Sequence, residues 1–237
     1  MNFRLSLTVV MAGLLYSGTA QAQEGSPIQI EGDVTIVSDY DYRGLSRTSG
    51  KLALQGGLAA FDENGLYGGF LLSSLNDDFM GYDAESELYI GYGFAAGAYD
   101  LDVSLSLDSL HQIGENQTGN TRHYGEIRGS IARDFGLAFI QLGAAYTPGN
   151  REYGLGQSAY SFAKVEVPLP LPQLPPSSLE FHVGYEAFEG VRDKLDWKVG
   201  LYMDLDIVEV GFKYYGTNRD SYAPASDSVV FSVRKYF

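Results

Sequence analysis

The sequence predicts an all-β fold: a single antiparallel transmembrane β-barrel of about twelve strands, within a range of roughly ten to fourteen. Three observations predict this fold. Segments of strand-like composition follow one another from residue 33 to the end of the chain. Within them, apolar and polar residues alternate with the period of a strand that lies between an apolar and a wet surface. Tight connectors alternate with longer polar ones, as they do in an antiparallel barrel.

The N-terminal residues 1–22 are set apart from the barrel and have the pattern of a cleaved secretory signal peptide. Arg4 is their only charge, residues 5–15 form a short apolar run, and Ala20-Gln21-Ala22 supplies a cleavage site. The alternative, a transmembrane helix, requires about 20 apolar residues, more than this run provides. We therefore expect a signal peptide at 1–22, a barrel domain at 23–237 and a location in the bacterial outer membrane.

The expected strands mostly have the length of tilted membrane strands, about 9–11 residues. They lie at 33–45, 51–61, 66–75, 84–94, 98–110, 123–133, 137–147, 158–167, 178–188, 197–204, 207–215 and 228–237. The register is clearest at 99–109, because a shift of one residue would place three carboxylates in lipid. The residues expected to face lipid include Leu101, Val103, Leu105, Leu107, Phe181, Val183, Val229 and Phe231.

The connectors give the barrel its orientation. Tight turns on the periplasmic side are expected at 62–65, 95–97, 134–136 and 205–206. Extracellular loops are expected at 76–83, 111–122, 148–157, 189–196 and 216–227. If the turn at 95–97 closes a tight hairpin, Gly91 and Gly93 lie beside Asp102 and Asp100. The proline-rich connector 168–176 is expected to be a stiff periplasmic turn, with a ligand for a proline-recognising protein as the alternative.

The last segment is expected to close the barrel by pairing with residues 33–43. Asp33 and Arg234 should then both point inward near the periplasmic rim, where a partly screened ion pair adds at most about 1 kcal/mol. A chain that ends on an aromatic residue after such a strand, as this one does at Phe237, resembles bacterial outer-membrane barrel proteins. That resemblance implies the barrel-assembly machinery, which reads the last strand, and outer-membrane lipids as partners.

Composition narrows the function classes. The formal net charge of −14 argues against nucleic acid as a partner, because a phosphate backbone selects basic surfaces. The charge favours cations or neutral solutes instead. The chain has no cysteine, which excludes a disulfide framework and a thiolate metal site. An aromatic content of 14% suits the girdles of tyrosine and phenylalanine that border the lipid band of a membrane barrel.

One stretch carries a family resemblance. The run Ser38-Asp39-Tyr40-Asp41-Tyr42-Arg43-Gly44-Leu45-Ser46-Arg47-Thr48 resembles the opening motif of the TorF-like porin family of proteobacteria. The residues that carry the resemblance are Ser38, Asp39, Tyr40, Tyr42, Arg43 and Gly44, and blocks up to Tyr92 look like the family's next motifs. Asp41 departs from the family's usual basic residue, so an anion preference does not carry over. The resemblance implies an outer-membrane porin and brings no catalytic residues with it.

The residues expected in the lumen are mostly acidic. The candidates for solute selection are Glu87, Asp100, Asp102, Asp108, Glu126, Arg128, Glu180, His182, Glu186, Lys198 and Arg234. A wall of carboxylates attracts cations, whereas pairing of these carboxylates with Arg128 and Lys198 would leave a generic hydrated wall. Glu180, His182 and Glu186 allow an acid/base or metal set, and loop 76–83 allows Ca²⁺. The blander alternatives, a hydrogen-bonded histidine and a solvated acidic loop, are favoured, so neither metal nor cofactor is expected.

The sequence thus predicts passive diffusion of small hydrophilic solutes, with cations preferred. A rival interpretation is a structural or adhesive barrel whose lumen is plugged by large inward residues such as Tyr67, Tyr89, Phe139, Tyr160 and Tyr202. A remoter one is a lipid hydrolase with a serine–histidine pair presented by two strands. The three histidines, at 111, 123 and 182, lack a G-x-S-x-G motif, so an enzyme is not expected.

Overall fold

The chain folds as a closed, all-β barrel of twelve antiparallel strands. The computed structural model describes residues 28–76, 80–113, 121–149, 156–219 and 227–237, so the predicted signal peptide lies outside the described residues. The barrel strands are β1 (Ile28–Val37), β4 (Ala53–Asp62), β5 (Leu66–Ser74), β6 (Ala84–Ala96), β7 (Tyr99–His111), β8 (Thr121–Asp134), β9 (Phe139–Thr147), β10 (Ser158–Leu169), β11 (Ser177–Phe188), β12 (Lys194–Asp204), β13 (Glu209–Thr217) and β14 (Asp227–Tyr236). The predicted fold class and strand number are confirmed.

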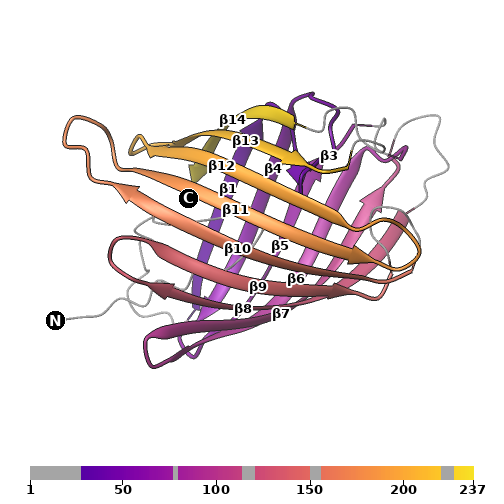
Figure 1. Ribbon diagram of the computed structural model, residues 1–237, viewed down its shortest axis with the longest axis horizontal. Helices are drawn as coiled ribbons and strands as arrows, with labels where there is room; N and C mark the ends of the chain where they lie inside the picture. Colours follow the sequence, from indigo (N-terminus) through magenta and orange to yellow (C-terminus); the bar gives the residue numbers. More distant parts are fainter. Residues whose placement is uncertain (1–27, 77–79, 114–120, 150–155, 220–226) are drawn as a thin grey trace.

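Neighbours in the chain are neighbours in the barrel, and β1 pairs with β14 to close it (Figure 1). At this seam Asp33 to Val37 pair with Tyr236 to Ser232, a shorter match than the predicted 33–43. Arg234 Nε lies 3.7 Å from Asp33 Oδ2, and both side chains line the lumen, as predicted. We call the end with the connectors 63–65, 97–98, 135–138, 170–176 and 205–208 the turn end, and the opposite end the loop end.

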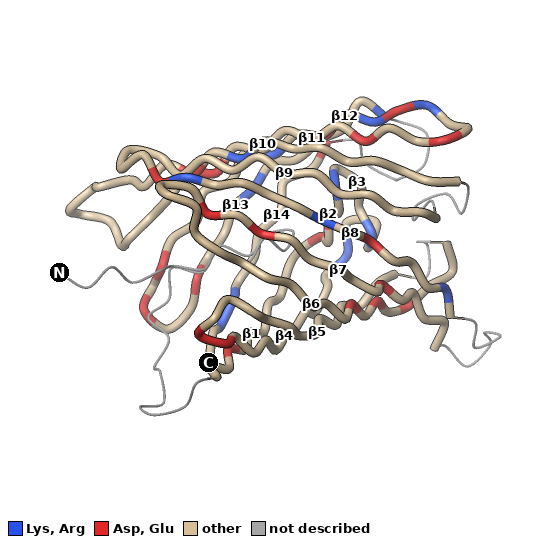
Figure 2. The backbone as a smooth tube through the Cα atoms, turned by 90° about the horizontal axis from the view of Figure 1, so that it is seen from below, with Lys and Arg blue, Asp and Glu red and all other residues tan. Residues whose placement is uncertain are grey.

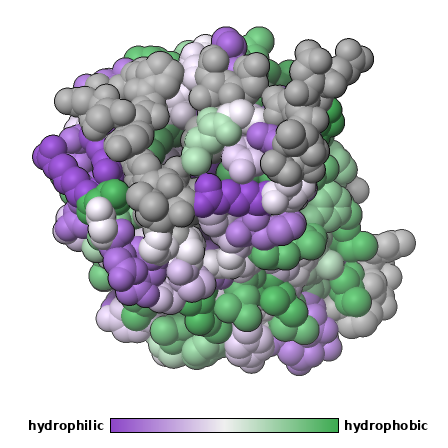
Figure 3. Space-filling model, turned by 90° about the vertical axis from the view of Figure 1, so that its right-hand side faces the viewer, coloured by the Kyte–Doolittle hydropathy of each residue, from purple (hydrophilic) through white to green (hydrophobic). Residues whose placement is uncertain are grey.

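The outer face of the barrel is apolar. Val103, Leu105 and Leu107 on β7 are exposed, while Ser106 and Asp108 between and beside them are buried towards the lumen. Phe181, Val183, Val229 and Phe231 are also exposed, so the predicted lipid-facing set lies on the outside. Figure 3 looks onto the loop end, where hydrophilic surface gathers near the mouth and hydrophobic surface lies on the flanks. Within the described ranges, no helix is long and apolar enough to span a membrane.

The predicted register between β6 and β7 was wrong. The turn between β6 and β7 uses residues 97 and 98, so Gly93 lies opposite Asp102 and Ala95 opposite Asp100. The sequence placed these partners two residues away, because it assigned the turn to Ala95-Ala96-Gly97. Gly97 has a φ of 68°, a conformation that glycine adopts without strain, which explains why the chain reverses there.

The larger correction concerns the first predicted strand, 33–45. The wall strand β1 ends at Val37, and residues 38–52 then turn into the lumen before β4 begins at Ala53. This inward segment contains a small hairpin of β2 (Asp41–Tyr42) and β3 (Leu45–Ser46). Arg43 and Gly44, with φ values of 48° and 79°, form its tip. Figure 2 shows the hairpin between the walls of the barrel.

The resemblance motif therefore does not form a wall strand. Ser38 marks the exit from β1, where its backbone N–H donates to Phe231 O, and Asp39 to Gly44 lie inside the lumen. The alternation of Tyr40 and Tyr42 with charged residues imitates a strand. Positive φ at the tip and burial of the charged residues against distant walls determine the actual path.

Candidate functional site

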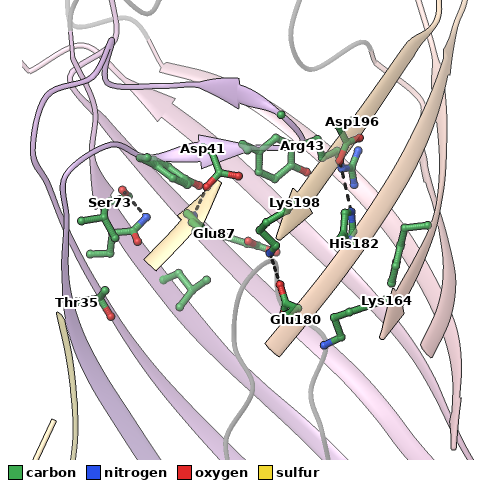
Figure 4. Close-up of a pocket in the computed structure, with 18 of the residues that line it drawn as sticks. Thr35, Asp41, Arg43, Ser73, Glu87, Lys164, Glu180, His182, Asp196 and Lys198 are labelled. Atoms are coloured by element: carbon green, nitrogen blue, oxygen red, sulfur yellow. Dashed lines mark hydrogen bonds and ion pairs between the residues drawn. The ribbon is translucent and has the colours of Figure 1, made fainter. Parts of the chain in front are cut away.

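The lumen holds a cavity of about 210 Å³. Its lining includes charged side chains of both signs (Figure 4). The described carboxylates that line it are Asp33, Asp41, Glu85, Glu87, Asp102, Glu180, Asp196 and Glu209, and the cationic side chains are Arg43, Arg128, Lys164, Lys198, Lys213 and Arg234. The cavity has room for several water molecules and polar partners to hold them.

The base of the inward segment is organised around Asp39, which is only 2% exposed. Its carboxylate accepts hydrogen bonds from the hydroxyls of Ser46 (2.5 Å), Thr48 (2.9 Å) and Tyr215 (2.6 Å) and from the backbone of Gly50 (3.2 Å). Tyr215 belongs to β13, so this carboxylate joins the segment to the wall. A buried carboxylate is stable when its oxygens receive several donors, and this one does.

A second contact at the base pairs Arg47 with Glu85 of β6. Both side chains are almost fully buried, and the hydroxyl of Tyr40 donates to the same carboxylate at 3.0 Å. The guanidinium of Arg47 lies over the ring of Tyr42, with its carbon 3.9 Å from the ring centroid. Breaking a buried ion pair by removing one partner is strongly destabilising, so this half of the segment is firmly held.

One residue joins the tip of the hairpin to two wall strands, β8 and β11, that lie three strands apart in the barrel. Arg43 Nη2 donates to both carboxylate oxygens of Glu126 on β8, at 2.9 Å each, and Nη1 donates to Glu186 on β11 at 3.0 Å. The guanidinium carbon lies 4.1 Å from the centroid of the Tyr160 ring. Burial lowers the pKa of Arg43, but the carboxylates of Glu126 and Glu186 outweigh burial and raise it well above the usual range.

These contacts belong to a continuous chain of alternating charges across the bore. On one side, Glu87 of β6 accepts from Arg128 of β8 at 2.7 Å, and Arg128 also donates to Glu126 at 2.5 Å. On the other side, Glu186 of β11 pairs with Lys194 of β12 at 3.2 Å. Arg43 links the two sides, so the inward segment crosses the lumen rather than lining it.

Most predicted selectivity residues face the lumen, but as ion pairs. Glu87, Glu126 and Arg128 form one group, Glu186 another, and Glu180 pairs with Lys198 at 2.7 Å. Asp102 accepts from the Tyr67 hydroxyl at 2.7 Å, and Asp108 from Ser106 at 3.1 Å. Asp100 is the exception, because it is exposed at the turn end opposite Ala95 and Ala132. The predicted acidic wall is thus partly neutralised by cationic neighbours.

Two residues of the predicted metal set, Glu180 and His182, make hydrogen bonds and ion pairs with other lumen residues. His182 stacks against Tyr160 and Phe162 and faces Asp196, with Nε2 3.4 Å from Oδ1, while Glu180 pairs with Lys198. Figure 4 shows these two pairs on neighbouring strands. Among the described residues no cluster of three or more acidic or histidine side chains suits a metal ion. Loop 76–83 lies partly outside the described residues.

The large inward aromatic residues narrow the bore, but the main obstruction of the bore is the inward segment 38–52. Tyr67 packs near Tyr89, and Tyr160 and Tyr202 line the cavity. The lipid-hydrolase interpretation finds two serine–histidine contacts near the loop end, Ser86 Oγ with His111 Nε2 and Ser109 Oγ with His123 Nδ1, both at 2.8 Å. The other ring nitrogen of His111 meets the Thr121 hydroxyl at 3.5 Å rather than a carboxylate.

Sequence reasoning missed several residues of this site. Arg47 and Tyr215 belong to the contacts at the base, and Lys194 and Asp196 lay in a segment assigned to a loop at 189–196. The only signal in the sequence was the density of charge between Asp39 and Arg47. Charged residues of both signs so close together suit buried pairing better than a lipid-facing strand.

Comparisons with known proteins agree with the fold. A family model described as "Bacterial protein of unknown function (Gcw_chp)" matches residues 21–236. No curated protein matches the sequence. Among solved structures, the KdgM porin matches with a TM-score of 0.54 and 10% identity over 87% of this chain and 98% of its own. An outer membrane channel from Pseudomonas putida F1 matches with a TM-score of 0.53 and 11% identity over 88% and 95% of the two chains. At such identities the likeness shows the barrel fold.

Proposed function

The chain belongs to the Gcw_chp family of bacterial proteins, and from that premise and its closed barrel we propose that it is a narrow outer-membrane channel for small hydrophilic solutes. The observation that carries this proposal is the pairing of an exposed apolar outer face with a lumen cavity that is lined by charged side chains and has room for several water molecules. That arrangement suits a protein surrounded by lipid on the outside and by water within. One similar structure is a KdgM porin in complex with disordered oligogalacturonate.

The proposal also includes the sequence predictions about the signal peptide, the orientation, the assembly and the finer family affiliation of the barrel. Residues 1–22 act as a signal peptide, residues 23–237 form the mature barrel, and the loop end faces the cell exterior. Phe237 serves the barrel-assembly machinery, and the finer affiliation is with the TorF-like porins. The backbone of Phe237 exchanges hydrogen bonds of 2.9 and 3.0 Å with Gly32, so this residue also takes part in closing the seam.

We further propose that the channel prefers cations, with a modest ratio. Eight carboxylates and six cationic side chains line the cavity among the described residues, so the lining keeps an acidic excess despite its ion pairs. A charged, low-dielectric cleft concentrates counter-ions. Asp102 contributes most directly, because its described partner is the neutral hydroxyl of Tyr67.

A second candidate function follows from the inward segment. Because residues 38–52 cross the lumen and are held by buried ion pairs, the barrel also suits a structural or adhesive role with a permanent plug. The two functions differ in one measurable property, which is whether ions pass through the purified barrel.

Recordings of the purified protein in planar lipid bilayers test the proposal. We expect discrete conductance steps that are cation-selective. Asp102→Asn should lower the cation-to-anion permeability ratio, whereas the matched change Asp100→Asn, at the exposed rim, should leave it nearly unchanged. Absence of conductance would favour the plugged structural barrel. Anion selectivity would show that paired acids do not govern permeation.

A further inference from the structure

The inward segment is much longer than its connection requires. Val37, the last residue of β1, lies directly opposite Ala53, the first residue of β4. Two antiparallel strands in that position are ordinarily joined by a turn of about two residues. The segment 38–52 instead spends fifteen residues entering the lumen and returning. Most of these residues are therefore not needed to connect the two wall strands, and their role lies in the lumen.

The two halves of the segment are held differently. The base, at Asp39 and Arg47, is tied to β13 and β6 through buried polar groups, and the backbone carbonyl of Arg47 accepts from Asn76 N–H at 3.3 Å. The tip, residues 41–45, pairs only with itself in the sheet hydrogen bonding. Its described ion pairs with the walls are those of Arg43 with Glu126 and Glu186 and that of Asp41 with Lys213.

The two carboxylates that hold Arg43 keep other partners when the tip leaves. Without Arg43, Glu126 keeps Arg128 and the Thr147 hydroxyl at 2.8 Å. Glu186 likewise keeps Lys194 and the Ser158 hydroxyl at 3.1 Å. Neither carboxylate is stranded, so the loss of Arg43 avoids the large penalty of an uncompensated buried carboxylate. At the base, departure of the segment would remove both the Arg47 guanidinium and the Tyr40 hydroxyl from Glu85.

The closed position of the tip is also tight. Arg43 has a φ of 48°, which an L-residue with a side chain rarely adopts. A Cβ added to Gly44 would lie 2.7 Å from Asp196 Cβ and 2.8 Å from Gly216 O, so the tip fits the wall only because residue 44 is glycine. Backbone strain and close packing concentrate at the point where the segment crosses the bore.

From these observations we propose that residues 41–45 form the gate of the channel, hinged on a fixed base and latched across the bore by Arg43. This inference rests on the proposed channel function. In the latched position the charge chain from Glu87 to Lys194 is continuous and the bore is crossed. When Arg43 leaves Glu126 and Glu186, the tip moves towards the loop end and a wider path opens.

The main test compares three proteins in planar bilayers: the wild type, Arg43→Met, and a variant in which residues 38–52 are replaced by Asn-Gly. We expect the wild type to conduct in brief openings, Arg43→Met to spend several-fold more time open, and the replacement to be open throughout at a higher level. Heat-modifiable migration in gels checks that each barrel is closed.

A glycine pair supplies the matched control. Gly44→Ala should also raise the open time, because the added methyl collides with the wall. Gly50→Ala carries the same type of backbone strain, with a φ of 74°, but meets nothing within 4 Å, so it should leave gating unchanged.

The failures are distinguishable. If none of the variants conducts, the plug-free replacement included, the channel function is overturned and the gate with it. If the wild type conducts and both Arg43→Met and Gly44→Ala leave the open time unchanged, the gate alone is overturned and the tip is a fixed constriction. If the replacement variant does not assemble, the open times of Arg43→Met and Gly44→Ala, compared with the open time of Gly50→Ala, still test whether residues 41–45 act as a gate.

Discussion

Arginine placed on the outer face of β7 tests the orientation of the whole barrel. β7 runs from Tyr99 to His111, so Leu105 is its middle residue and Val103 lies two positions away. A strand that rises about 3.4 Å per residue with a tilt of about 40° advances about 2.6 Å per residue along the barrel axis. Val103 is then about 5 Å from the midplane, well inside an apolar band about 25 Å tall.

We expect Val103→Arg to lower the free energy of unfolding by about 2–3 kcal/mol, because a guanidinium in hydrocarbon lacks hydrogen-bond partners. Leu101→Arg, about 10 Å from the midplane, should cost only about 0–1 kcal/mol. Ser130→Arg is the control: Ser130 lies opposite Asp102, hence close in depth to Val103, but lines the lumen.

The measurement is urea-dependent unfolding in liposomes, followed by the fluorescence of Trp197, the chain's single tryptophan. Equal losses for Val103→Arg and Ser130→Arg would refute the assignment of faces. A loss at Leu101 as large as that at Val103 would refute the placement of the lipid band.

Two further substitutions probe the seam and the lumen, both by thermal unfolding in detergent. Arg234→Gln should lower stability by about 1–3 kcal/mol, because it removes a charged donor to the Thr35 hydroxyl at 2.9 Å as well as the 3.7 Å contacts with Asp33 and Glu209; no measurable loss would mean that these contacts do not support closure. Gly184→Ala should cost about 1–3 kcal/mol through overpacking, because the new methyl would lie 2.0 Å from the Tyr160 hydroxyl. Gly129→Ala, whose nearest neighbour is 3.7 Å away, should be close to neutral, and similar losses at the two glycines would contradict the packing described.

The period of two was enough to predict the wall of the barrel. Leu101, Val103, Leu105 and Leu107 could be assigned to lipid from the sequence because the intervening carboxylates and serines admit only one register. The pairing of the first and last strands was predicted by the same argument, since Asp33 and Arg234 both had to point inward. Such predictions depend on neighbours along one strand, and local pattern determines them.

The inward segment could not be predicted in the same way. Tyr40 and Tyr42 alternate with charged residues as a strand would, and the local pattern favours the wall. Its actual position depends on Glu126 and Glu186, which lie 83 and 143 residues further along the chain from Arg43. Only the closed barrel brings these carboxylates to one level. The β6–β7 register failed for a smaller reason, the exact place of a two-residue turn.

The seam has a consequence for the order in which the molecule assembles. β1 matches β4 over ten residue pairs but matches β14 over only five, and residue 32 meets residue 237 there. Every other joint in the wall links strands adjacent in the chain, whereas this one must gather both ends of the polypeptide at a large entropic cost. Closure at the seam is therefore expected as the late, slow event of folding. The same joint should part first under force or denaturant, with the hairpins on either side still intact.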